Sequence, residues 1–551
     1  MTIEDSLSYS KHTRNKSSID QGIKNLNLKK RKSSLYQNFN TTNIYNKCFQ
    51  NYYNSYQYLK PQPCYVSNIK SNVYHWQLRD LIKFNNLSND LYYTKNDCIM
   101  KYNLQSFNIN SHLKLNYNPR CFNHFNDFIV TGGVLTSSSK LFSLNLSNLS
   151  NLSNSSTNNN NNDKRINKGL FSFFNGSNLH TVKVGEMINN DVTIYSNGQN
   201  QFNSYICNND TFLYSLDISN NDIKMVNKLN CETNTCLNNV VKNPCQNLLI
   251  VTGDSSSIFF IDPNQNKVVN KINSHHESGF GVSYHSNGYL FSSVFQDGIC
   301  QLYDLRNTKD VITEIKSTRQ GHQSGAFRVC KFSPENDFND LLIISEHVGR
   351  IHLIDLRNLS NVNKDHQVIV VPAALDQYGE FKANNKHEPI DIYGDFTSPL
   401  VYDYDYLTNV NPKLFKEFSY QFQQSPESSP PKLNTPNYST TTANEDTTVL
   451  SSISPRASID FDSQLNDIYM SHEPTNPSRS DSYMLNSNYV EDSYQQYSNH
   501  IHGEMELSGI EFCNPLNSSD SKIIIGCQDA GILMWDINTN SRRSFSSFEM
   551  I

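Results

Sequence analysis

The chain has 551 residues with a formal net charge of −6, and 37% of them are hydrophobic. This composition suffices for a core of about 300 residues and leaves about 200 for tails and inserts. No stretch approaches the roughly 20 apolar residues of a membrane span, and the first residues lack a signal peptide's apolar segment, so we expect a cytoplasmic or also nuclear protein without membrane contact. The acidic balance argues against a general nucleic-acid role, because phosphate binding needs a basic surface.

Residues 1–60 are predicted to form a disordered N-terminal tail. The tail is polar and contains one basic cluster, Lys29 to Lys32, in the stretch "KKRKSS". This cluster is either a nuclear localisation signal or solvated charge without a function.

A short pattern recurs along the next part of the chain. It is clearest in "QLYDLR" at 301–306 and "HLIDLR" at 352–357. Before the second copy, an alternating strand pattern from Phe327 stops at the turn signal Ser333-Pro334, and two apolar runs follow it. Three short strands in about forty residues, repeated at a fixed spacing, indicate stacked supersecondary units.

The closing part of this pattern occurs seven times. Its small polar position is Asn103, Ser143, Ser215, Asp262, Asp304, Asp355 and Asp536. Four of the six intervals are close to the roughly 40 to 45 residues of a four-stranded propeller blade. The two longer intervals contain low-complexity inserts, at 145–163 and within 383–502, which cannot bury apolar surface.

We therefore predict an all-β protein, a seven-bladed β-propeller with long inserts. Blades one to six occupy residues 61–382, interrupted by the disordered Asn/Ser-rich insert at 145–163. An irregular segment and a disordered Ser/Pro-rich insert follow at 383–502, and the last blade is expected at 503–541. Residues 542–551 are either a docking tail or the last outer strand of the ring.

Two dipeptides resemble the ends of WD repeats, namely Gly321-His322 and Trp535-Asp536. The resemblance implies a hydrogen-bonded network of His, Ser, Asp and Trp in each blade. Asp297 and Asp529 stand where the family has its turn Asp, whereas Val348 stands there in another blade, so the network is incomplete. We interpret these residues as structural.

The sequence lacks the motifs of catalysis. It contains no G-x-x-x-x-G-K-[ST], H-E-x-x-H or G-x-S-x-G pattern. Side chains of the adjacent His275 and His276 would point to opposite faces of a strand, and the pair Cys231 and Cys236 has no further ligands at zinc spacing. We expect no enzyme activity, no cofactor and no metal, and a rigid platform whose loops bind partner proteins.

Three further stretches carry a resemblance to a known family: "VYHWQLRDLI" at 73–82, "PIDIYGDFTSPLVYDYDYL" at 389–407 and the end "RRSFSSFEMI" at 542–551. Together with "LIDLRN", they resemble a fungal family of WD-repeat proteins, formerly a domain of unknown function, that includes an exchangeable substrate receptor of the GID ubiquitin ligase. The resemblance covers roughly residues 60–551. It implies that the propeller holds the N-terminal degron of a substrate and that an apolar C-terminal tail docks on the scaffold subunit of the ligase.

The tail has suitable apolar anchors in Phe545, Phe548, Met550 and Ile551. A substrate N-terminus carries an α-ammonium group with a pKa of about 7.7 to 8, so the pocket must supply a carboxylate or several carbonyl oxygens. The candidate carboxylates near strand ends are Glu277 and Glu346.

Two other functions remain open. A generic WD-repeat scaffold or adaptor without a link to ubiquitin would have the same fold. A phosphoinositide-binding propeller needs a Phe-Arg-Arg-Gly motif, and the nearest string here, "AFRVC" at 326–330, lacks the paired arginines.

Overall fold

The structure is a computed structural model that describes residues 58–60, 62–135, 168–198, 201–219, 222–334, 340–372, 375, 388–391, 400–405, 407–408, 504–514, 521–528 and 530–539. Several predictions lie outside these residues: the N-terminal tail up to residue 57 with its basic cluster, the insert at 145–163, most of the segment predicted at 383–502, the turn residue Asp529, and the C-terminal tail at 542–551 with all four apolar anchors.

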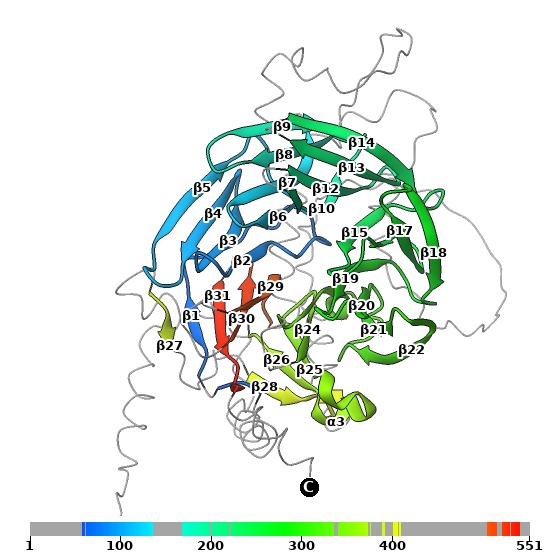
Figure 1. The fold of residues 1–551 in the computed structure, drawn as a ribbon. Coiled ribbons are helices and arrows are strands. Elements are labelled where there is room, and N and C mark those ends of the chain that lie inside the picture. Colours follow the sequence, from blue (N-terminus) through cyan, green and yellow to red (C-terminus); the bar gives the residue numbers. More distant parts are fainter. Residues whose placement is uncertain are drawn as a thin grey trace, which may run out of the picture. The chain divides into compact units, whose positions relative to one another are not determined.

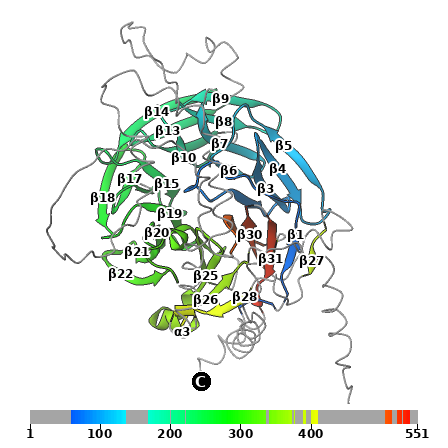
Figure 2. The same ribbon diagram turned by 180° about the vertical axis from the view of Figure 1, so that it is seen from behind.

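The described residues form seven antiparallel sheets arranged as the blades of a ring (Figure 1, Figure 2). The first blade has β2 (Ile82–Asn85), β3 (Asp90–Lys95), β4 (Cys98–Asn103) and β5 (Ile109–Lys114). The second has β6 (Cys121–Phe125), β7 (Phe128–Leu135), β8 (Lys168–Phe174) and β9 (Leu179–Lys183). The third has β10 (Asn189–Val192), β11 (Tyr195–Gly198), β12 (Gln201–Asn208), β13 (Phe212–Ser219) and β14 (Asp222–Asn230). The predicted seven-bladed propeller is confirmed.

The fourth blade has β15 (Leu237–Lys242), β16 (Leu249–Gly253), β17 (Ser257–Asp262) and β18 (Lys267–Asn273). The fifth has β19 (Gly279–Tyr284), β20 (Leu290–Phe295), β21 (Ile299–Asp304) and β22 (Asn307–Lys316). The sixth has β23 (Phe327–Phe332), β24 (Leu341–Glu346), β25 (Arg350–Asp355), β26 (Gln367–Val370) and β28 (Leu400–Asp403). The seventh has β29 (Leu507–Cys513), β30 (Lys522–Cys527), β31 (Gly531–Asp536), β1 (Cys64–Val66) and β27 (Ile390–Asp391).

Helical segments are short in the described part of the chain. The 3-10 turn η3 (Gln323–Gly325) precedes β23, and η4 (Leu356–Asn361) leads into the single-turn helix α3 (Val362–Asp365). No described helix has the length and apolar character needed to cross a membrane.

The burial pattern of the strands follows their place in each blade. The inner strands are almost wholly buried, as in β24, whose six residues all are, because a neighbouring blade covers each face. The outer strand β22 alternates exposed and half-buried residues along most of its length, since one face meets solvent. The core is thus a series of apolar layers between adjacent blades. One layer contains Ile351 and Leu353 of β25 together with Ile510 of β29.

The ring is closed by the N-terminal strand β1. It pairs with β31 in an antiparallel register that sets Tyr65 opposite Leu533, and β27 pairs with its other edge. Both edges of β31 are thus paired, with β30 and with β1; residues 542–551 lie outside the described residues, and the two alternatives for them stay predictions. The seventh blade draws its strands from three separate parts of the chain, because a short strand paired on both edges can be recruited from any distance along the sequence.

The predicted register holds at five of the seven closing positions, fails at one, and one position lies outside the described residues. Asn103, Asp262, Asp304 and Asp355 end the third strand of their blades, and so does Asp536, whereas Ser215 lies within β13. In the second blade the third strand is β8, and Ser143 lies outside the described residues. The predicted insert lies between β7 and β8 in the sequence, and the third strand of this blade carries "LFSF" at 170–173.

Candidate functional site: the central channel

The centre of the ring contains a cavity of about 370 Å³. Residues from the first strand of every blade line it, because these strands lie closest to the ring axis (Figure 1). First strands of neighbouring blades are in contact around the channel, for example β15 with β19, β19 with β23, and β23 with β29. The segment 77–80, just before β2, completes the lining.

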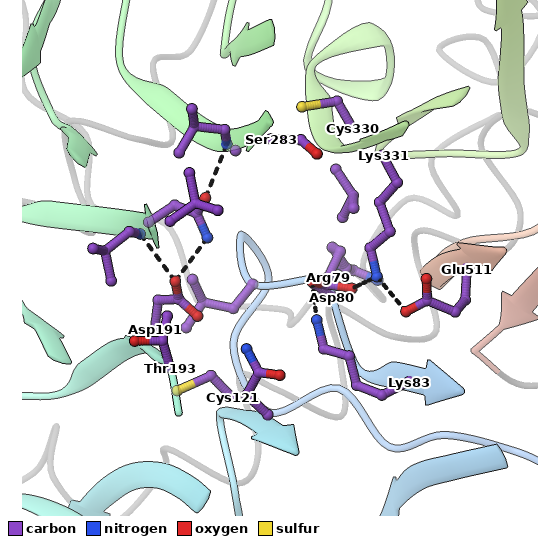
Figure 3. A pocket seen from close by; sticks show the side chains of 18 of the residues that line it. Arg79, Asp80, Lys83, Cys121, Asp191, Thr193, Ser283, Cys330, Lys331 and Glu511 are labelled. Carbon is purple, nitrogen blue, oxygen red and sulfur yellow. Dashed lines mark hydrogen bonds and ion pairs between the residues drawn. The ribbon is translucent and has the colours of Figure 1, made fainter. Parts of the chain in front are cut away.

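One wall of the cavity is an ion-pair cluster. The ammonium group of Lys331 lies 2.9 Å from a carboxylate oxygen of Asp80 and 2.7 Å from one of Glu511. Lys83 pairs with the same Asp80 (Figure 3). Burial opposes the charged form of Lys331, but the two carboxylates outweigh it and hold its pKa above the ordinary range. The charges on this wall therefore satisfy one another.

The opposite wall carries a carboxylate with neutral partners. Asp191 of β10 accepts hydrogen bonds from the Asn239 side chain at 2.8 Å and from the Val240 amide at 3.0 Å, and its other oxygen accepts from the Val192 amide at 2.9 Å. Among the described residues, no cation forms an ion pair with it. Burial raises the pKa of Asp191 to about 7, although the Val240 amide and the distant Lys83 act in the opposite direction.

Residues 73–82, one of the family-like stretches, run along the channel. Arg79 is 3% exposed, and its guanidinium group donates to Glu506 at 2.9 Å, to Gln528 at 2.7 Å and to the Leu507 carbonyl. These contacts anchor the segment to the seventh blade. They also place the neighbouring Asp80 where it can pair with the two lysines of the channel wall.

The other end of this segment is rich in aromatic and cationic groups. The Arg328 guanidinium lies 5.0 Å from the ring centre of Trp76 and 4.4 Å from that of Phe280, and it donates to Gln296 at 2.7 Å. Arg120 lies over Tyr74 at 5.8 Å. Cation–π contacts of this kind stabilise an arginine that is removed from water.

His75 lies among these groups as a neutral side chain. Burial lowers its pKa to about 3, and the guanidinium groups of Arg120 and Arg328 add to the effect. At neutral pH the positive charge at this end of the cavity therefore belongs to the arginines.

The structure places the two sequence-predicted carboxylates away from the cavity. Glu346, at the end of β24, is fully buried and is bound by Arg319 at 2.6 Å, by the Ser317 hydroxyl at 2.8 Å and by His352 at 3.0 Å. Burial raises the pKa of Glu346, but Arg319 and His352 outweigh it and hold the pKa well below the ordinary range. Glu277 is exposed in the connection between β18 and β19. Neither lines the channel, and a ligand role for either stays a prediction.

The WD-like residues have structural roles. His276 Nδ1 lies 2.7 Å from the carboxylate of Asp297, the residue at the family's turn-Asp position. His322 caps η3 and contacts Ser324 Oγ at 2.7 Å, and the Trp535 indole donates to the Lys60 carbonyl at 2.7 Å. The two histidine contacts stabilise turns, and the Trp535 contact joins the last blade to the segment before β1.

Sequence reasoning missed Asp191, Glu511 and Lys331. No repeat signal marks the first strand of a blade, because only the third strand carries the closing pattern. A weak signal existed in charged residues within otherwise apolar strand patterns, such as Lys331 in "FRVCKF". In the described part of the chain, no group of three or more His, Cys, Asp or Glu side chains could hold a metal ion.

Comparison with known proteins gives uncharacterised relatives. Residues 325–370, which include β23 to β26, match the family model "Uncharacterised protein domain (DUF2415)". An uncharacterised protein of Saccharomyces cerevisiae is 31% identical over 333 residues, which cover 50% of this chain and 44% of that protein. An uncharacterised protein of Schizosaccharomyces pombe is 22% identical over 335 residues, which cover 56% of this chain and 83% of that protein. The matched region thus spans less than half of the budding yeast relative.

Two solved structures are similar to part of this chain. The β-propeller domain of Cps50 (Swd1) from Myceliophteria thermophila is 8% identical with a TM-score of 0.39, covering 53% of this chain and 86% of that one. A chain of a mitotic checkpoint complex is 9% identical with a TM-score of 0.40, covering 55% and 80%.

Proposed function

We propose that this protein is the substrate receptor of a GID-type E3 ubiquitin ligase and that it binds the N-terminal degrons of substrates destined for the proteasome. The observation that carries the proposal is the channel cavity, whose volume of about 370 Å³ lies in the range of about 300 to 1,000 Å³ typical of small-ligand pockets. A chain end can enter such a channel end-on. An internal segment of a folded protein would have to leave again through the same space.

The chemistry of the cavity favours an N-terminus over a C-terminus. Its lining includes Asp191, a carboxylate without a cationic partner among the described residues, whereas Lys83 and Lys331 are already paired with Asp80 and Glu511. The lining arginines are also engaged: Arg79 pairs with Glu506, and Arg328 contacts the rings of Trp76 and Phe280 and donates to Gln296. An ammonium group is the ligand charge that such a lining would attract.

Attachment to the ligase is assigned to the C-terminal tail. The place beside β31 is taken by β1, so the ring does not require residues 542–551 for its closure. Phe545, Phe548, Met550 and Ile551 would supply the apolar contacts with the scaffold subunit.

The proposal is tested by a variant that separates docking on the ligase from binding of the substrate. Removal of residues 548–551 is expected to abolish ubiquitylation of a substrate while its affinity for the receptor stays unchanged. A matched control replaces Ser546 and Ser547, polar residues of the same tail, with alanine, and should retain full turnover. Normal turnover with the truncated protein would refute the docking role.

The alternative is a WD-repeat scaffold or adaptor without a ubiquitin link. It rests on the propeller fold, which presents loops of several blades on one face. Under this alternative, deleting residues 548–551 would leave every partner bound.

A further inference from the structure

We infer that Asp191, together with the side-chain oxygen of Asn190, is the subsite that binds the ammonium group of the ligand. This inference rests on the proposed function and names the residues that would recognise the substrate's first residue. Both residues line the channel cavity, and Figure 3 shows Asp191 across the open space from Lys331 and Glu511.

The position of Asp191 is fixed by two blades. Its carboxylate receives hydrogen bonds from Asn239 and Val240 of β15 in the fourth blade and from Val192 of its own strand, at 2.8 to 3.0 Å. Three donors leave part of the acceptor capacity of the two oxygens unused, since a carboxylate can accept about four hydrogen bonds. The group is therefore held in place and still able to accept from a ligand.

Asn190 supplies a second acceptor. Its amide nitrogen donates to Asn209 at 2.6 Å and to the Leu237 carbonyl at 2.9 Å, which fixes the orientation of the amide. Its side-chain oxygen has no hydrogen-bond partner, although the residue is only 4% exposed. A buried acceptor without a partner destabilises the folded protein, and a bound donor would offset this loss.

A break in the strand register brings these neighbours to one cavity. Adjacent residues of a regular strand point to opposite faces. The pairing of β10 with β12 shifts between Asn189 and Asp191, so Asn190 occupies an irregular position. Such bulges re-aim side chains and are common beside functional sites. Both Asn190 and Asp191 can then contribute to the lining.

The charged surroundings of Asp191 leave room for a cation. Lys83 and Asp80 act on it from across the cavity with opposite signs. The other titratable groups coupled to it are Cys121 of β6, Cys207 of β12 and Tyr195 of β11, whose pKa values burial raises, so that they are neutral at pH 7. A carboxylate that is half-withdrawn from water without a counter-ion is stabilised when an ammonium group arrives.

The experiment measures binding of ten-residue peptides to the full-length protein by fluorescence anisotropy. The library varies the first two residues, and each peptide is made with a free and with an acetylated N-terminus, with and without an internal lysine. Free N-termini are expected to bind, and acetylation or Asp191→Asn should each weaken binding at least about tenfold, because a charge-assisted hydrogen bond is lost. Asn190→Ala should weaken it several-fold.

The matched control is Asp222→Asn, which makes the same charge change in the same blade, on the exposed outer strand β14 and away from the cavity lining. It should leave affinity within about threefold, and urea unfolding of each variant establishes that it is folded. Equal affinity of wild type and Asp191→Asn for a free N-terminus would overturn the inference and leave the proposed function standing.

Two other outcomes separate the inference from the proposed function. If acetylated peptides with an internal lysine bind and Asp191→Asn abolishes this binding, Asp191 is the ammonium subsite but the ligand is a lysine side chain, and the N-degron role is contradicted. If no peptide of the library binds the wild-type protein, both are contradicted.

Discussion

The guanidinium group of Arg79 lies 2.9 Å from the carboxylate of Glu506, and both side chains are almost completely buried. The pair joins the segment that enters the first blade to the start of the last blade. It therefore stabilises the ring at the point where the two ends of the propeller meet, and it positions Asp80 in the channel wall.

Loss of this pair should destabilise the protein strongly. Arg79→Met leaves the Glu506 carboxylate buried without its counter-charge, which costs about 3 to 5 kcal/mol in the free energy of unfolding. Urea unfolding measures the loss. The control is Lys224→Met, at an ion pair whose side chains are 67% and 66% exposed, where we expect at most about 1 kcal/mol. Equal effects at the two sites would show that the buried pair does not stabilise the ring.

The closing strand can be tested at Tyr65. Its ring is completely buried in the layer that also contains Leu533, and its hydroxyl donates to the Ala530 carbonyl. Tyr65→Ala should therefore reduce the free energy of unfolding by about 3 to 5 kcal/mol. Tyr289→Ala, at a tyrosine that is 44% exposed, should change it by less than about 1 kcal/mol. A small loss at Tyr65 would mean that β1 is dispensable for ring closure.

Gly349 is expected to be required for two reasons: its left-handed backbone conformation and the lack of space beside it. Gly321 is a control that shares only the first. Its φ of 62° lies in the left-handed region, and an added Cβ would stand 2.5 Å from the Cβ of Glu504, which pairs with Arg350. Gly321 has a φ of 75° with no atom near an added Cβ, so Gly321→Ala should cost about 1 to 2 kcal/mol through backbone strain alone. Gly349→Ala should cost about 1 to 3 kcal/mol more through overpacking, as measured by thermal or urea unfolding. Equal losses at both sites would contradict the packing against Glu504.

The burial of Asp191 predicts a specific dependence of stability on pH. Its pKa is about 7 in the folded protein and about 3.9 in an unfolded chain. Between these values the folded state binds a proton that the unfolded state does not, so the contribution of Asp191 to stability falls as pH rises from about 4 to 7 and is then constant.

Asp191→Asn removes this titration. The difference in unfolding free energy between variant and wild type should move in favour of the variant by a few kcal/mol between pH 4 and pH 7.5, while other titrating groups cancel in the comparison. A difference that does not change with pH would show that Asp191 ionises as it does in water, and it would remove the electrostatic support for the ammonium subsite.

The sequence was sufficient for the architecture and insufficient for the site. The third strands of most blades were predictable because Asp262, Asp304 and Asp355 close the same local pattern, which depends only on neighbouring residues. Ring closure was not predictable from the sequence, because β1 pairs with β31 across nearly the whole chain and no local pattern marks this pairing.

The site depended on contacts between distant residues. Glu346 was selected because it stands near a strand end, but Arg319 from another blade connection engages it in the folded protein. Asp191 is distinguished by the absence of an ion-pair partner among the described residues, and its hydrogen-bond donors Asn239 and Val240 lie in the next blade. Only the assembled ring shows which carboxylate lacks a counter-charge.

The most direct test of the proposed function is affinity purification of the full-length protein followed by mass spectrometry of its partners. We predict that scaffold subunits of a GID-type ubiquitin ligase co-purify with the wild-type protein and are lost when residues 548–551 are removed. Recovery of a stable set of partners that contains no ligase subunit, and that is unchanged by the truncation, would contradict the substrate-receptor role and favour a scaffold.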